Sequence, residues 1–143
     1  MHLVKEILLR KNVQPVTVSP ATTVFDALQI MADKNIGSVI VTSAGNYLGI
    51  VTERDYSRKV ILKNKHSVNT EVSEIMSTDL MDVSPTTSID DCMKIMSENN
   101  IRYLPVFDNS ELVGIVSMSD LVKQIIVTQK KTIEDLNSYI YSQ

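Results

Sequence analysis

The chain has 143 residues, of which 43% are hydrophobic and 22% charged, and its formal net charge is −3. This length is enough for one domain or for two small units that share a core. Mild acidity disfavours a general nucleic-acid binder, because neutralising phosphates needs a surplus of Lys and Arg. The sequence contains no apolar run of about 18 residues, so no membrane span is predicted. Its single cysteine excludes an intramolecular disulfide. We therefore expect a folded cytoplasmic protein, with neither nucleic acid nor membrane among its partners.

The first predicted element is a helix over residues 1–11, with Leu3, Ile7 and Leu8 on one side. Ser19-Pro20, further along, is a pair that ends a strand and favours a turn. The periodicity around this turn predicts the following elements: an extended piece at 16–18, a helix with apolar positions 24, 27, 28 and 31, strands at 38–42 and 47–51, and a helix that begins near Thr52.

The same order of elements returns in the second half of the chain. Residues 18–55 align without a gap on residues 83–120, and 14 of the 38 aligned pairs are identical. The extended piece of the second copy is expected at 81–83, and Cys92 falls on the apolar stripe of its first helix, where we expect an inert core residue. The chain is therefore a tandem repeat with the order β-α-β-β-α in each copy.

Two such copies should pack against each other with pseudo-two-fold symmetry, because one small sheet cannot cover its own apolar face. The fold class expected is α/β (α+β), with clefts where the sheets of the two copies meet. The predicted organisation is repeat 1 at 12–63, a linker at 64–73, repeat 2 at 74–128 and a helical extension at 129–143.

The last helix carries a long apolar stripe. Such a stripe on a terminal helix usually packs against the domain or against a second subunit. Its members are Val122, Ile126, Ile133, Leu136 and Ile140.

Both copies end their second strand with one motif, at 49–55 and at 114–120: Gly, two apolar residues, a hydroxyl residue, two variable residues and Asp. The simplest interpretation of a hydroxyl residue followed three positions later by Asp is a helix capping box. Two further pairs of this kind lack the preceding strand, and we interpret them as caps alone. They are Thr23 with Asp26 and Ser88 with Asp91.

At 49–55 the context also suits a ligand. A strand that leads directly into a helix N-terminus presents free N–H groups and a positive dipole to an anion. Gly49 lacks a side chain, which would allow close approach of a ligand. Thr52 can offer its hydroxyl to a phosphate or ribose oxygen, and Asp55 can accept two hydrogen bonds from a ribose cis-diol. These groups predict a site for the ribose-phosphate part of a nucleotide, with helix capping as the alternative.

The duplication and its motif resemble the cystathionine β-synthase (CBS) domain pair, or Bateman module, over about residues 12–128. Within that family the chain is similar to stand-alone single-pair proteins that carry T-E-R-D-Y-x-R-K, here residues 52–59, and I-R-[HY]-[IL]-P-V, here residues 101–106. The resemblance implies binding of AMP, ADP or ATP, or sometimes of NAD or S-adenosylmethionine, in the clefts. It also implies a homodimer and the regulation of a partner protein, which the sequence does not identify.

The resemblance further implies which residues contact the ligand. In the first site Thr52 and Asp55 would hold the ribose and phosphate, and the adenine would lie against Thr17, Val18, Ser38, Val39 and Ile40. In the second site Ser117 and Asp120 would hold the ribose and phosphate, with Val83, Tyr103, Leu104 and Pro105 near the base.

The two copies differ in charge around the motif. Copy one has Arg54, Arg58 and Lys59 there, whereas copy two has Met118, Ser119 and Leu121 in and just after its motif. We therefore expect the first site to bind a phosphorylated nucleotide more tightly. Arg102, at the strand entrance of copy two, is a candidate phosphate contact beside Arg54 or Arg58, and a solvated arginine is the alternative.

Neither catalysis nor a metal site is expected. Ser19 and Ser84 have no histidine at a spacing that suits a relay. His2 and His66 have no partners at metal-ligand spacing. The leading hypothesis is an adenine-nucleotide-sensing regulatory module. The alternative is a dimerisation or interaction scaffold whose nucleotide clefts are vestigial and whose working part is the C-terminal helix.

Overall fold

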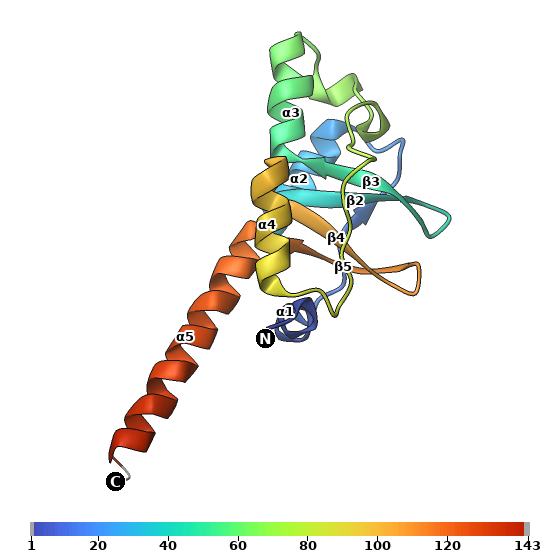
Figure 1. Ribbon diagram of the computed structural model, residues 1–143. Coiled ribbons are helices and arrows are strands. Elements are labelled where there is room, and N and C mark those ends of the chain that lie inside the picture. The colour runs from blue at the N-terminus through green and yellow to red at the C-terminus, as the bar shows by residue number, and fades with distance from the viewer. Residues whose placement is uncertain (1, 142–143) are drawn as a thin grey trace. The chain divides into compact units, whose positions relative to one another are not determined.

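The computed structural model describes residues 2–141, which form two compact units (Figure 1). The first-repeat unit comprises residues 14–80. The second-repeat unit comprises the residues up to 13 together with those from 81 onward. The N-terminal helix therefore belongs to the second repeat, although the chain leads from that helix directly into the first repeat.

The first-repeat unit contains a three-stranded sheet in the order β1-β2-β3. Its elements are β1 (Thr17–Val18), α2 (Val24–Lys34), β2 (Ser38–Ser43), β3 (Asn46–Thr52) and α3 (Glu53–Lys59). β1 is parallel to β2, and β2 is antiparallel to β3 with Ser38 opposite Thr52. Val24, Ala27 and Met31 of α2 are buried against this sheet, which confirms three positions of the predicted stripe.

The segment after α3 is part of this unit. It forms three short 3₁₀ turns, at Ile61–Lys63, Ser67–Asn69 and Val72–Glu74. Thr70 is buried, and Ile50 and Ser77 exchange two backbone hydrogen bonds of 3.0 and 2.9 Å. The predicted linker at 64–73 therefore packs with the first repeat, and the border between the units follows residue 80. Backbone groups at the edge of β3 need partners, and this segment supplies them.

From its second helix onward, the second-repeat unit repeats the helix-strand-strand-helix order of the first-repeat unit, and it has an N-terminal helix in addition. Its elements are α1 (Val4–Lys11), α4 (Ile89–Asn99), β4 (Tyr103–Asp108), β5 (Glu111–Ser117) and α5 (Met118–Tyr141). β4 and β5 are antiparallel with Tyr103 opposite Ser117, which matches the pairing of Ser38 with Thr52 in the first-repeat unit. The mixed α and β composition is as predicted, and so is the duplicated order α-β-β-α.

The extended piece expected at 81–83 is shorter than predicted. Only an isolated parallel bridge joins Val83 to Val106, whereas β1 is a strand. In the first-repeat unit the N–H of Ile40 donates to Val16 O at 2.9 Å. Pro105 occupies the position equivalent to Ile40 and has no N–H to donate. One proline therefore removes the hydrogen bond that extends the pairing in the first copy.

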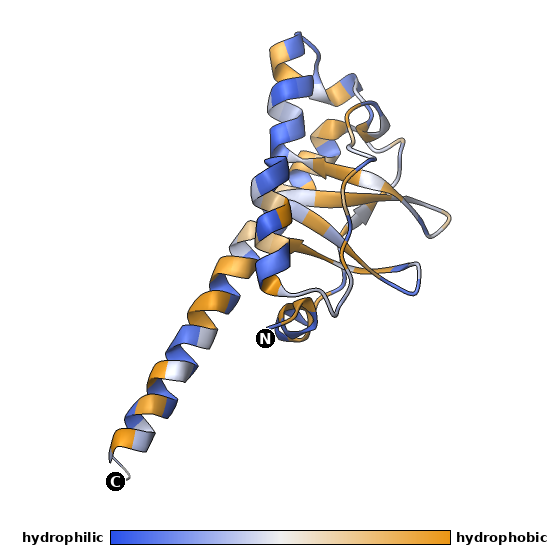
Figure 2. Cartoon of the chain, viewed as in Figure 1, coloured by the Kyte–Doolittle hydropathy of each residue, from blue (hydrophilic) through white to orange (hydrophobic). Residues whose placement is uncertain are grey.

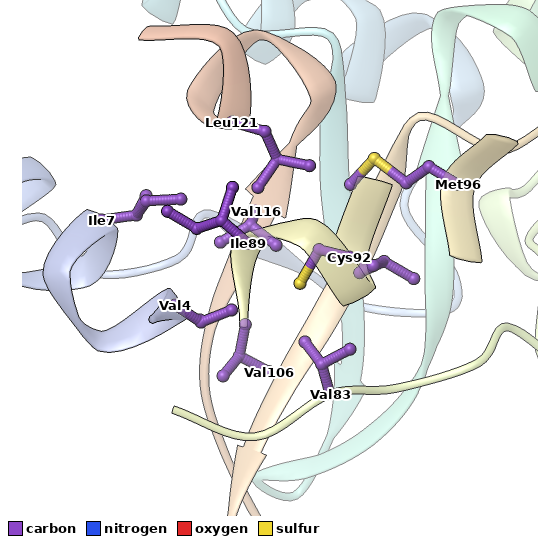
Figure 3. Packing of buried hydrophobic residues seen from close by; sticks show 10 residues of the cluster. Val4, Ile7, Val83, Ile89, Cys92, Met96, Val106, Val116 and Leu121 are labelled. Carbon is purple, nitrogen blue, oxygen red and sulfur yellow. The ribbon is translucent and has the colours of Figure 1, made fainter. Parts of the chain in front are cut away.

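The core of the second-repeat unit is closed by α1 (Figure 3). Val4 and Ile7 of α1 point toward Cys92 of α4 and Leu121 of α5, and all four side chains are fully buried. Cys92 is thus the core residue that the sequence predicted. Burial, with a smaller contribution from the charge of Asp91, raises the pKa of its thiol to about 11.

α5 is packed only over its first turns. Leu121 and Gln124 are buried, but every described residue from Gln129 onward is exposed. Figure 2 shows apolar residues recurring along this exposed part of the helix. The predicted stripe is therefore not buried within its own unit. No helix among residues 2–141 is both long and apolar enough to cross a membrane.

Candidate functional site

The junction of β3 and α3 carries the first copy of the motif, and it forms a reciprocal capping box. Asp55 Oδ2 accepts hydrogen bonds from the Thr52 N–H at 2.9 Å and from the Thr52 hydroxyl at 3.1 Å. In return, the Asp55 N–H lies 3.1 Å from Thr52 Oγ1. Asp55 is only 8% exposed. The capping interpretation is therefore confirmed, because this carboxylate accepts a hydrogen bond from the backbone at the start of its own helix, and ligand binding by the same carboxylate stays a prediction.

A lysine neutralises the other oxygen of the same carboxylate. Lys59 Nζ lies 3.0 Å from Asp55 Oδ1 and donates to Ile75 O at 2.9 Å. The sequence placed Lys59 among the phosphate candidates and did not identify it as a partner of Asp55. The signal was available, since residues four apart on a helix are neighbours. Arg54 and Arg58 of α3 are exposed.

The junction of β5 and α5 forms the same reciprocal capping box, but its lysine contacts the carboxylate oxygen that caps the helix. The Ser117 N–H donates to Asp120 Oδ2 at 2.9 Å, and the Asp120 N–H donates to Ser117 Oγ at 3.1 Å. The cation at this junction is Lys11 of α1, whose Nζ lies 3.0 Å from Asp120 Oδ2 and donates to Ile115 O at 3.1 Å. Sequence reasoning missed Lys11, and no local pattern links two residues that lie 109 positions apart.

The two hydroxyl–Asp pairs outside the motif form simpler helix caps. The Asp26 N–H donates to Thr23 Oγ1 at 3.1 Å, and the Asp91 N–H donates to Ser88 Oγ at 3.0 Å. Among the described α-helices that begin with a hydroxyl residue and an Asp at this spacing, the reciprocal bond to the acid forms only at the two motifs. Their prediction as helix caps is confirmed.

The interpretation of Gly49 as an opening for a ligand is wrong. A Cβ atom at Gly49 would lie 2.6 Å from the backbone oxygen of Ser77, so the chain itself fills this space. At the equivalent Gly114 a Cβ would lie 2.7 Å from Leu8 Cδ2 of α1. Both glycines admit a neighbouring segment of their own unit, because anything larger than hydrogen would collide with it.

The other predicted residues of the first site lie on neighbouring strands of one sheet. Val39 is opposite Val51, and Ile40 is paired with both Ile50 and Thr17. Val39 and Ile40 are almost fully buried, as are Ser38 and Val18, whereas Thr17 is exposed. The buried apolar members can offer a ligand little besides their backbone groups, which is the contact that the family resemblance implied.

The residues predicted for the second site gather in the same way. Tyr103 is opposite Ser117, Leu104 and Pro105 are buried beside it, and Val83 donates to Pro105 O at 3.1 Å. Arg102 is exposed, and its backbone oxygen accepts from the N–H of Met118, the first residue of α5, at 2.9 Å.

The predicted meeting of Arg102 with Arg54 or Arg58 would join residues of different units and stays a prediction. Within residues 2–141, no three His, Cys, Asp or Glu side chains lie together as a metal-binding group.

Comparisons with known proteins identify the duplicated unit. The profile of the CBS domain family matches residues 4–61 and 72–127. Over 123 residues, 82% of this chain, the sequence is 36% identical to the mitochondrial CBS domain-containing protein CBSX3 of Arabidopsis thaliana. Over 108 residues, 76% of the chain, it is 37% identical to the CBS domain-containing protein YhcV of Bacillus subtilis. The matched regions span 60% and 76% of those two relatives.

A solved structure supports the same assignment. A protein with CBS domains from Burkholderia ambifaria MC40-6 superposes with a TM-score of 0.85 at 42% identity, covering 89% of this chain and 96% of that protein.

Proposed function

The chain belongs to the CBS-domain family and carries two copies of the domain, and on this premise we propose that it binds an adenine nucleotide and regulates a partner protein. CBS-domain proteins are typically regulatory modules that bind adenosine-containing ligands. The observation that carries the proposal is the repetition of one cluster in both units. A hydroxyl, a largely buried carboxylate and a lysine meet at the start of a helix, once around Asp55 and once around Asp120.

The capping boxes are compatible with this role, because a carboxylate has about four acceptor positions. The bonds described above occupy three of them on Asp55, two on Oδ2 and one on Oδ1. A ribose diol needs two positions, so Lys59 would have to leave Oδ1. A phosphate group on the same ligand would give the lysine a stronger anionic partner. Ligand binding can therefore spare the bond from the Thr52 N–H that holds the helix start.

The same reasoning favours a phosphorylated ligand at the first-repeat site. α3 carries Arg54 and Arg58 together with Lys59 in its seven residues. In the second copy Lys123 of α5 is equivalent to Arg58, but Ser119 and Gln124 stand in place of Arg54 and Lys59. The contacts to Asp120 come from α1, where Lys11 lies against the carboxylate and Arg10 donates to the Asp120 backbone oxygen at 3.4 Å. We propose that the number of phosphates is sensed mainly at the first-repeat site.

Calorimetric titration of the full chain with AMP, ADP, ATP, NAD and S-adenosylmethionine tests the proposal. Asp55→Asn keeps an oxygen for the Thr52 N–H but removes the charge. We expect it to weaken nucleotide binding by about tenfold or more, since hydrogen bonds to charged groups contribute about 1.5–3 kcal/mol. Asp26→Asn is the matched control at a helix start with a one-way cap, and it should leave affinity unchanged.

The proposal fails if none of the five ligands binds the unsubstituted chain, or if Asp26→Asn and Asp55→Asn weaken binding equally. Asp120→Asn measures the second site, and a loss equal to that of Asp55→Asn would contradict the preference for the first. The absence of catalysis and a location in the cytoplasm stay predictions.

The scaffold with vestigial clefts is the second candidate. It is favoured by the exposed apolar stripe of α5 and by the fact that both acids already have partners within their own units. This scaffold hypothesis predicts that no nucleotide changes the melting temperature of the protein.

A further inference from the structure

The apolar residues on the exposed part of α5 follow a heptad repeat. In the letters of a coiled coil, the a positions are Ile126, Ile133 and Ile140, and the d positions are Val122, Gln129 and Leu136. The five apolar members are between 45% and 63% exposed. Figure 2 shows apolar residues recurring at intervals toward the C-terminal end of α5. Six consecutive layers of a coiled-coil seam thus lie open in the single chain.

We propose that α5 pairs with α5 of a second copy of this chain in a parallel two-stranded coiled coil over residues 122–140. β-branched residues at a combined with Leu at d favour two strands in a parallel pair. Here isoleucine occupies every a position, and Leu136 occupies one of the three d positions beside Val122 and Gln129.

The polar residue in the seam selects the orientation. In a parallel pair each Gln129 lies beside Gln129 of the second copy, and an amide can donate to and accept from its twin. In an antiparallel pair that engages all six layers, Gln129 of each copy would face Ile133 of the other copy. That arrangement would leave two buried amides without a partner, which is unfavourable.

Charges beside the seam agree with the parallel arrangement. The same antiparallel register brings Lys130, at position e, next to Lys130 of the second copy, and like charges in contact are unfavourable. In the parallel pair e positions face g positions. Lys130 then lies beside Ile125 and Asn137 beside Thr132, so no like charges meet. Residues 122–140 carry three lysines and two acids, a net charge of only +1, which gives little attraction to an anionic lipid surface as the occupant.

Sedimentation equilibrium of the full chain over a hundredfold concentration range tests the pairing. Ile133→Asp should halve the mass of the oligomer and weaken association at least about a hundredfold, because each dimer loses two buried isoleucines and gains two buried charges. Ser138→Asp adds the same charge at position f, on the opposite side of the helix, and should leave the mass unchanged. Circular dichroism and the melting temperature should show that both variants fold, since both positions are exposed.

A second variant tests the orientation. Leu136→Cys should form a disulfide-linked dimer on oxidation, because equivalent d residues meet only in the parallel pair. The buried Cys92 should not react under the same conditions. The proposal is overturned if the unsubstituted chain is monomeric throughout, if Ile133→Asp leaves the mass unchanged, or if Leu136→Cys does not cross-link. Monomeric chains that instead bind lipid vesicles through Ile133 would identify a membrane surface as the occupant.

Discussion

Gly49 and Gly114 occupy equivalent positions in the two copies but lie against different atoms. Replacing each with alanine therefore tests whether the motif glycine makes room for a ligand or for a neighbouring segment of the chain. In Gly49→Ala the new Cβ would lie 2.6 Å from Ser77 O, a backbone atom. That oxygen accepts from the Ile50 N–H at 3.0 Å, and the Ser77 N–H donates back to Ile50 O at 2.9 Å. Relieving the collision therefore pushes apart a bridge of two backbone hydrogen bonds.

The expected magnitudes differ between the two sites. Losing two backbone hydrogen bonds costs about 2 kcal/mol, and the lower entropy of the unfolded alanine chain returns about 0.4–1 kcal/mol. Gly49→Ala should thus lower the free energy of unfolding by about 1–2 kcal/mol. In Gly114→Ala the obstacle is Leu8 Cδ2, the end of a flexible side chain. Rotating it costs about 0.5–1.5 kcal/mol. After the same entropic return, the loss in free energy of unfolding should lie between about −0.5 and +1 kcal/mol.

Urea unfolding followed by circular dichroism measures both changes, and calorimetry measures nucleotide affinity in the same variants. The reasoning is refuted if Gly114→Ala is the more destabilising of the two. It is also refuted if Gly49→Ala leaves stability intact while abolishing ligand binding, because the glycine would then serve the ligand after all.

Two further predictions concern the second-repeat unit. Cys92 should resist thiol reagents while the protein is folded. Because its folded pKa of about 11 exceeds its ordinary value of 9.0, the free energy of unfolding should fall as pH rises from about 9 through about 11. Cys92→Ala, which introduces the residue found at the equivalent Ala27, should remove this pH dependence from a series of unfolding measurements. Lys11→Met should lower the free energy of unfolding by about 1 kcal/mol, because the ion pair with Asp120 is partly buried. Lys5→Met, at an exposed position of the same helix, should have almost no effect. Equal losses in the two variants would contradict a stabilising role for the Lys11–Asp120 pair.

The sequence predicted what depends on local periodicity and on duplication. The helix stripe of Val24, Ala27 and Met31, the order of helices and strands along the chain and the helix caps all depend on short stretches that occur twice. The missing first strand of the second copy also has a local cause, since Pro105 in place of Ile40 removes one N–H donor.

Contacts between distant segments were not predictable in this way. The approach of Ser77 to Gly49 and the pairing of Lys11 with Asp120 depend on where flanking segments pack, and these segments lie outside the aligned repeat. Duplication was misleading here, because equivalent positions suggest equivalent surroundings. The flanks differ between the copies, and so do the atoms that meet each glycine and each acid.

The two copies also differ at the position one helical turn after the motif acid. The residue four positions after the motif acid is Lys59 in the first copy and Gln124 in the second. Gln124 is buried and uncharged, so the second copy draws its cation from α1 through Lys11. Under the proposed function, a ligand that claims the Asp120 carboxylate competes with Lys11, and Lys11 also bonds to Ile115 O of β5. Binding at the second site would therefore loosen the contact of α1 with β5, whereas binding at the first would disturb only residues of its own repeat.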